Sequence, residues 1–126
     1  MTTNRPHIGI AAALLIGAAA LHGYEHVILA TLPDAWSYVW SMLPYMLCLI
    51  VLVLSANAVP GIAGAAIALS LDAIAHYEVF INPKGSTAAL ALLFLPLWST
   101  IIFVPITMLV ARTVVRKREA RGEHAP

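Results

Sequence analysis

Two short stretches of this chain combine imidazole and carboxylate side chains within otherwise apolar sequence. The first holds His22, Glu25 and His26, and the second holds Asp72 and His76. At about 100° per residue, spacings of three and four place the members of each stretch on one face of a helix. Ionisable groups at membrane depth are costly to bury and usually serve a function. The two stretches therefore predict one functional site.

The chemistry that suits these side chains is the binding of a transition metal. Imidazole nitrogen and carboxylate oxygen bind Zn, Fe and Cu, and helical bundles build such sites from inward-facing histidines and carboxylates. We predict that the ligands are His22, His26, Asp72 and His76. Glu25 would hold a ligand in place or act as the catalytic base on a metal-bound water.

Composition indicates the solvent in which this site must work. The chain has 126 residues, of which 61% are hydrophobic and 10% are charged, and its mean hydropathy is +0.88. A soluble domain carries about 25% charged residues. The sequence therefore predicts a membrane protein made of a single transmembrane domain, residues 1–126. The single cysteine, Cys48, excludes an intramolecular disulfide, and no nucleic-acid-binding signature is present.

Four apolar runs predict an all-α bundle of four transmembrane helices, at about 8–30, 38–58, 61–81 and 88–110. Each run is long enough as a helix to cross a hydrocarbon core of about 30 Å. Five of the seven Lys and Arg residues lie in the basic tail, 111–126. Because positively charged residues stay on the cytoplasmic side, we expect a multi-pass protein of the cell membrane with both termini cytoplasmic.

The helical rise of about 1.5 Å per residue gives the depth of each polar group. His22 lies about 12 Å and Asp72 about 14 Å from the outer ends of their runs. Tyr45 and Cys48 in the second run, and Ser99 in the fourth, reach comparable depths. We therefore expect the first and third helices to present their polar faces to each other.

Further expectations concern how the runs pack and bend. Gly61 and Gly64 are small enough to let neighbouring helices approach closely in lipid. Pro96 and Pro105 should kink the fourth helix, because proline lacks the amide hydrogen and clashes with the preceding turn.

Two patterns resemble known metal motifs. The sequence from His22 to His26, H-x-x-E-H, is similar to the motif of the inverted zinc proteases, although the chain has no room for a soluble catalytic fold. The pair Asp72 and His76 resembles the copper-binding helix of the C subunit of particulate methane and ammonia monooxygenases. Only those two residues match, and the chain is shorter than that subunit.

Several functions fit the pattern, and the sequence leaves open whether the protein is an enzyme. The first is a membrane metalloprotein, either an enzyme on a lipid-soluble substrate or a metal-holding subunit, working as a homo-oligomer or beside a partner membrane subunit in the bilayer. The second is a b-haem protein that anchors or transfers electrons, with His76 and either His22 or His26 as axial ligands. The third is a proton-coupled small transporter in which Glu25 or Asp72 carries the proton.

A purely structural role is the remaining alternative. Hydrogen-bonded polar pairs contribute only about 0.6 kcal/mol on average in a membrane. Inserting one central charge costs roughly 2.5–3.5 kcal/mol. Fastening helices is therefore a poor reason to place five ionisable groups at one depth.

Overall fold

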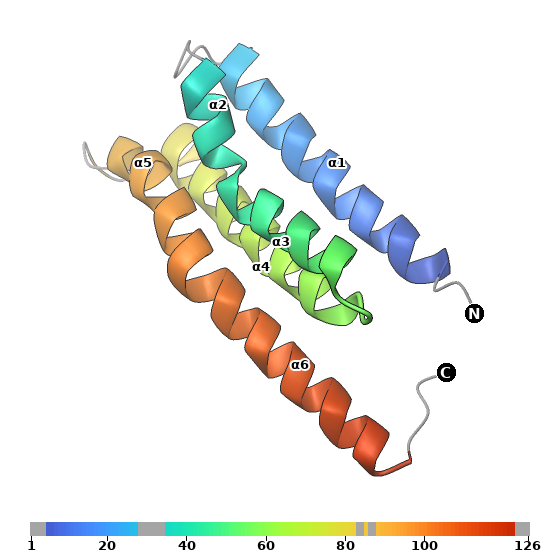
Figure 1. Cartoon of the computed structure of the whole chain (residues 1–126). Helices are drawn as coiled ribbons and strands as arrows, with labels where there is room; N and C mark the ends of the chain where they lie inside the picture. The colour runs from blue at the N-terminus through green and yellow to red at the C-terminus, as the bar shows by residue number, and fades with distance from the viewer. Residues whose placement is uncertain (1–4, 28–34, 83–84, 86–87, 123–126) are drawn as a thin grey trace.

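A computed structural model describes residues 5–27, 35–82, 85 and 88–122, and this part of the chain contains helices and no strands. The prediction of an all-α protein is confirmed. Figure 1 shows helical arms that run alternately up and down the bundle. In chain order the helices are α1 (Arg5–Val27), α2 (Ala35–Ser41), α3 (Leu43–Leu54), α4 (Val59–His76), η1 (Tyr77–Ile81), α5 (Ala88–Trp98), η2 (Ser99–Phe103) and α6 (Val104–Ala120), where η marks a π-helix.

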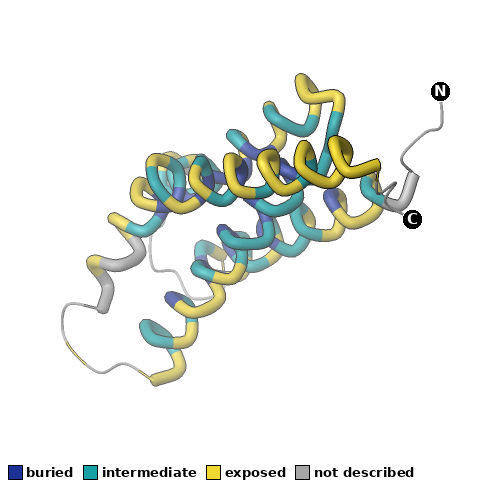
Figure 2. The backbone as a smooth tube through the Cα atoms, turned by 90° about the horizontal axis from the view of Figure 1, so that it is seen from below, coloured by how far each residue is buried: buried dark blue, intermediate teal, exposed yellow. Residues whose placement is uncertain are grey.

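Three helical stretches in the described part of the chain are long and apolar enough to cross a membrane: His7–Val27, Val59–Ile81 and Leu93–Ala120. Large apolar side chains face outward along them, including Ile16, Ile74 and Leu109. Figure 2 shows that buried positions alternate with exposed ones along the helices. An exterior of this kind suits lipid rather than water. These features indicate a membrane protein.

The second predicted run, 38–58, forms two helices instead of one. The chain turns at Met42, and α3 begins at Leu43 with Pro44 in its first turn. Proline cannot donate the helical hydrogen bond and its ring clashes with the carbonyl four residues earlier. Helix α3 has 12 residues and alone spans about 18 Å. The second run is therefore an interrupted arm, and the count of four membrane spans stays a prediction.

The fourth arm accommodates its prolines through a π-helix. The η2 segment, Ser99–Phe103, lies between Pro96 and Pro105. The Thr100 hydroxyl donates to the Pro96 carbonyl oxygen at 2.7 Å. A π-helical turn changes the hydrogen-bond register where the usual partner is missing. The predicted disturbance of this helix is thus a local change of winding within a continuous arm.

Helix α4 is the centre of the bundle and packs against α1, α3 and α6. A Cβ atom added at Gly61 would lie 2.6 Å from Leu52 Cγ, and one added at Gly64 would lie 2.7 Å from Met108 Cε. The prediction that these glycines permit close helix approach is confirmed. Because α4 packs against several helices, Asp72 and Ala75 near its end are buried, whereas Ile74 faces outward.

Candidate functional site

His22 lies at the centre of a polar network between α1 and α4. Its Nδ1 atom is 3.1 Å from Glu25 Oε2, and its Nε2 atom is 3.1 Å from Asp72 Oδ2. Glu25 stands one turn further along α1, where a spacing of three residues brings two side chains together. All three side chains are buried, with at most 5% of each residue exposed. Both nitrogens of one imidazole therefore face carboxylates.

The network continues at both ends through two more side chains. The Tyr45 hydroxyl, from α3, donates to Asp72 Oδ2. At the other end, His76 Nδ1 lies 2.8 Å from Glu25 Oε1. The result is a linear chain of hydrogen bonds drawn from three helices, in the order Tyr45, Asp72, His22, Glu25, His76.

Burial changes along this chain from one end to the other. Tyr45 is 1% exposed, and beside it lies the apolar core that includes Cys48 and Ala68. The His76 side chain is 17% exposed and contacts the rings of Tyr24 and Phe80. The network therefore has a closed end at Tyr45 and a more accessible end at His76.

Counting hydrogens shows that the network holds a proton beyond the neutral imidazoles. Three hydrogen bonds join His22 and His76 to the two carboxylates, and each bond needs one hydrogen. An ionised carboxylate only accepts, and a neutral imidazole donates once. The two imidazoles supply two hydrogens, so the third bond requires one added proton. That proton resides on His22 or on one of the carboxylates.

The structure directs His26 away from this network. Its Nδ1 atom donates to the His22 carbonyl oxygen at 2.9 Å, one turn earlier in the same helix. Its ring meets the Tyr38 ring edge-on, with centroids 5.5 Å apart. The Nε2 atom is buried and has no hydrogen-bond partner within the described residues.

The four predicted metal ligands are consequently divided. His22 and Asp72 meet directly, His76 forms a hydrogen bond with Glu25, and His26 is bound to backbone. Among the residues that the structure describes, no group of three or more His, Cys, Asp or Glu side chains is arranged to hold a metal ion. The physical reason is that Glu25 lies between the imidazoles and satisfies both. Metal binding stays a prediction.

No protein-family model, curated protein or solved structure matches this chain. The contacts bear on the two short motif resemblances. In the H-x-x-E-H stretch, His22 bonds to carboxylates and His26 to a carbonyl oxygen. Asp72 and His76 likewise have different partners, since Asp72 bonds to His22 and Tyr45 whereas His76 bonds to Glu25. In neither motif do the two side chains converge on one position where a metal ion could bind.

The structure shows the surroundings of two polar residues that residue spacing does not assign to the site. In the sequence only depth distinguishes Tyr45, and in the structure its hydroxyl donates to Asp72. Ser99, at a similar depth in η2, is fully buried, and its hydroxyl has no hydrogen-bond partner in the part of the chain described. In both cases the only indication in the sequence is a hydroxyl group at the membrane depth of the His and carboxylate side chains.

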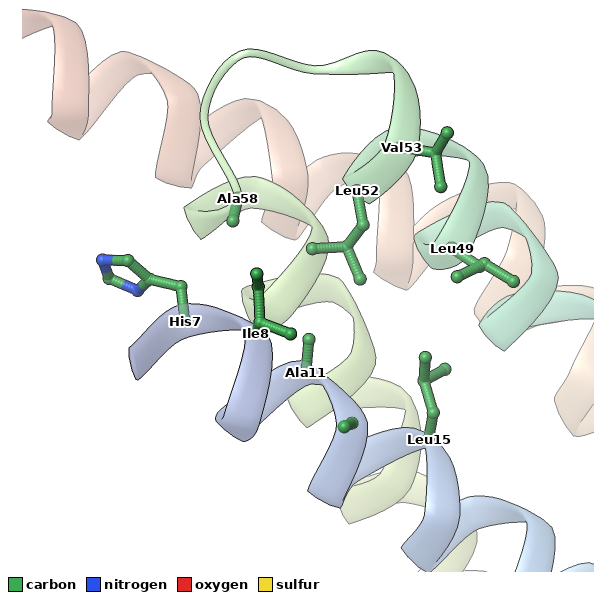
Figure 3. Close-up of a pocket in the computed structure, with 9 residues that line it drawn as sticks. His7, Ile8, Ala11, Leu15, Leu49, Leu52, Val53 and Ala58 are labelled. Carbon is green, nitrogen blue, oxygen red and sulfur yellow. The ribbon is translucent and has the colours of Figure 1, made fainter. Parts of the chain in front are cut away.

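A separate pocket of about 270 Å³ lies near the start of α1, far from the network along that helix. Figure 3 shows side chains of α1 and α3 facing each other across it. Apart from His7 its lining is apolar: Ile8, Ala11, Ala12, Leu15, Leu49, Leu52, Val53 and Ala58. The pocket shows that α1 is loosely packed against α3 at this end.

Proposed function

We propose that this chain is a small membrane proton transporter whose buried network takes up and releases a proton. In this proposal the arms α1, α2 with α3, α4 with η1, and α5 through α6 each cross the bilayer, with both termini cytoplasmic. The observation that supports it is the position of His22 between Glu25 and Asp72. Imidazole is the side chain whose charge changes most readily near neutral pH.

The linear order of the groups favours proton transfer over a structural role. A proton can pass from His22 Nδ1 to Glu25 Oε2 and, once the protonated carboxyl oxygen faces His76, from Glu25 to His76 Nδ1 in the tautomer that carries its hydrogen on Nε2. Moving a bare charge through this depth would be costly, whereas a chain of donors and acceptors keeps the charge paired at every step. His76, the more exposed member, is the group that exchanges with the outside.

Proton entry into liposomes tests this proposal. Protein is reconstituted with a trapped pH-sensitive dye, and a potassium diffusion potential drives protons inward. Wild-type protein should acidify the lumen faster than protein-free liposomes. Glu25→Gln should reduce the rate to that of protein-free liposomes, because the amide cannot accept and release the proton. Glu119→Gln makes the same chemical change near the end of α6, outside the network, and should retain the wild-type rate.

Infrared difference spectra between acidic and alkaline buffer give a second readout that needs no transported solute. Wild-type protein should show a protonation band from the network that disappears in both Glu25→Gln and Asp72→Asn. The band should remain in Glu119→Gln. Equal spectra and equal proton entry in all these variants would show that the network does not exchange protons.

A transition-metal site is the second candidate, and the orientation of two imidazoles favours it. His26 bonds through Nδ1 to a carbonyl oxygen, and His76 through Nδ1 to Glu25. Metal-ligating histidines are held in this way, with the opposite nitrogen left for the ion. Rotation of these rings toward His22 and Asp72 would assemble the predicted ligand set. In that case Glu25 would orient His22 and His76 through their Nδ1 atoms.

Elemental analysis of detergent-purified protein separates the two candidates. Stoichiometric Zn, Fe or Cu that is lost in His22→Gln and in His76→Gln would support the metal site. Protein that carries no metal after dialysis against each ion, yet conducts protons, would support the transporter. A visible absorption spectrum of the same sample tests the haem alternative, which no specific contact favours.

A further inference from the structure

A second polar surface lies at the opposite end of the bundle from the network. It is a pocket of about 380 Å³ between the α3–α4 turn and α6. Ser55 and Asn57 line it from the turn, and Arg112 and Arg116 line it from α6. Asp72, a member of the network, lies 13 residues after Val59 at the start of α4, so the pocket lies about 20 Å from the network.

The two arginines form the cationic wall of this pocket. They are four residues apart on α6 and therefore share one helix face. Within the described part of the chain, neither guanidinium forms an ion pair. Like charges at this spacing destabilise a helix, and an anion bound between them would remove that repulsion. Guanidinium groups match the geometry of phosphate oxygens through paired hydrogen bonds.

The α3–α4 turn adds donors on the opposite wall. Asn57 Oδ1 accepts a hydrogen bond from the Val59 backbone N–H at 2.9 Å. With its oxygen engaged, the Asn57 side chain has its NH₂ group left to donate. Helix α4 begins at Val59, and the partial positive charge of a helix N-terminus attracts anions. Two opposite walls therefore favour negative charge.

The net charge of the pocket lining indicates what charge a bound anion should carry. Glu119 lines the pocket together with Arg112 and Arg116. One carboxylate against two guanidiniums leaves a single net positive charge. This matches a phosphodiester, which carries one negative charge, better than free phosphate, which carries nearly two at neutral pH.

The surroundings of the pocket resemble the boundary between lipid tails and headgroups. Leu54 and Val115 contribute apolar surface to the lining. Neighbouring apolar side chains on α3 and α6, including Val53 and Leu109, face outward. Beyond them along α6 the charged residues begin. A ligand here would have apolar surface on one side and cations on the other.

We propose that this pocket binds the phosphodiester headgroup of an anionic phospholipid. The guanidiniums of Arg112 and Arg116 hold the phosphate, Asn57 and Ser55 donate from the turn, and the acyl chains follow the apolar face of α3. The site is distinct from the proton network and does not depend on the function proposed for it.

Native mass spectrometry of the detergent-purified protein, titrated with phosphatidylglycerol, measures this binding. Wild-type protein should retain one lipid more tightly than it retains phosphatidylcholine, whose headgroup adds a cation. Arg112→Gln/Arg116→Gln should bind phosphatidylglycerol roughly thirtyfold more weakly, since each basic residue near a membrane surface contributes about fivefold. Arg112→Lys/Arg116→Lys, which keeps the charge, should recover part of the affinity.

The matched control is Arg118→Gln/Arg121→Gln, which removes the same charge from the same end of the chain but outside the pocket lining. This variant should bind phosphatidylglycerol within about threefold of wild type. Equal weakening in both double variants would overturn the proposal, because the tail would then act as a diffuse charge. Inorganic phosphate that displaces the lipid at low millimolar concentration would overturn the lipid assignment in favour of a free anion. Circular dichroism of each variant verifies that the helices are retained.

Discussion

His22 exchanges its hydration for two carboxylate partners, and that exchange explains why three ionisable groups share a buried position. An isolated charge at this depth is expensive. When an imidazole lies between Glu25 and Asp72, each charge is paired and each hydrogen has an acceptor. Removing one partner leaves a buried group unsatisfied, which costs more than the bond itself contributes. The predictions for single residues follow from this difference between the cost of an unsatisfied buried group and the contribution of the hydrogen bond itself.

Tyr45→Phe should destabilise the protein by about 0.5–2 kcal/mol, the usual range for a side-chain hydrogen bond in a membrane. The substitution deletes the hydroxyl that donates to Asp72 and keeps the ring that fills the core. Unfolding by increasing denaturing detergent, followed by circular dichroism, measures the change. Tyr77→Phe removes the same hydroxyl from a half-exposed residue and should have little effect. Comparable losses in the two variants would contradict the assigned contact.

His76→Ala should destabilise the protein more than His26→Ala does. His76 donates to the buried Glu25 carboxylate, and removing a donor from such a group costs about 1–3 kcal/mol. His26 donates to a carbonyl oxygen of its own helix, which keeps its helical hydrogen bond after the substitution. In the Glu25→Gln background the penalty of His76→Ala should shrink, because no charge is left unpaired. An unchanged penalty would show that the two side chains are not coupled.

Residue spacing predicted part of this site and could not predict the rest. The helical rise placed His22 and Asp72 at one depth, and the structure brings them into contact. Spacing also put His26 on the same face as His22, but a histidine within one turn of a backbone carbonyl has a local partner available. The position of Glu25 between two imidazoles depends on how α1 and α4 pack, which periodicity does not specify.

At the scale of helices, the close approach of α4 to its neighbours fixes the geometry of the network. Gly64→Val should destabilise the bundle by about 1–3 kcal/mol, the usual effect of overpacking a filled interior. The added atoms would meet Met108 and Cys48, and α6 or α3 would have to move. Gly9→Val offers the matched control, since nothing lies within 4 Å of a Cβ atom added there. Equal stability of the two variants, measured by detergent unfolding, would show that α4 does not pack this closely.

The helices themselves were predictable to different degrees. Hydropathy correctly predicted the long helices within α1, α4 and the last arm, because lipid requires uninterrupted apolar surface. It did not predict the turn at Met42 or the π-helix at Ser99–Phe103. Both lie near prolines. A proline in a helix can be accommodated by a kink, a turn or a π-helical segment, and packing against the neighbouring helices determines which one forms. Composition measures how apolar a run is but carries no information on its winding.

For the whole molecule, the alternating arms predict which ends face which side of the membrane. The first turn of α1 and the last turn of α6 lie at the same end of the bundle (Figure 1). In a Cys48→Ser background, a cysteine introduced at Gly122 should react with a membrane-impermeant thiol reagent only from the cytoplasmic side. A cysteine introduced at Asn82 should react only from the opposite side. Both positions are exposed, and labelling of both from one side would contradict four crossings.

The two ends of α1 are held in different ways. Near its start, α1 borders an apolar pocket that separates it from α3. Near its finish, two hydrogen bonds of the network join it to α4, through His22 with Asp72 and through Glu25 with His76. If the network exchanges a proton as we propose, each gain or loss of that proton changes how firmly the end of α1 is attached to α4. Acidification would then loosen or tighten one end of the first helix while its other end stays as it is.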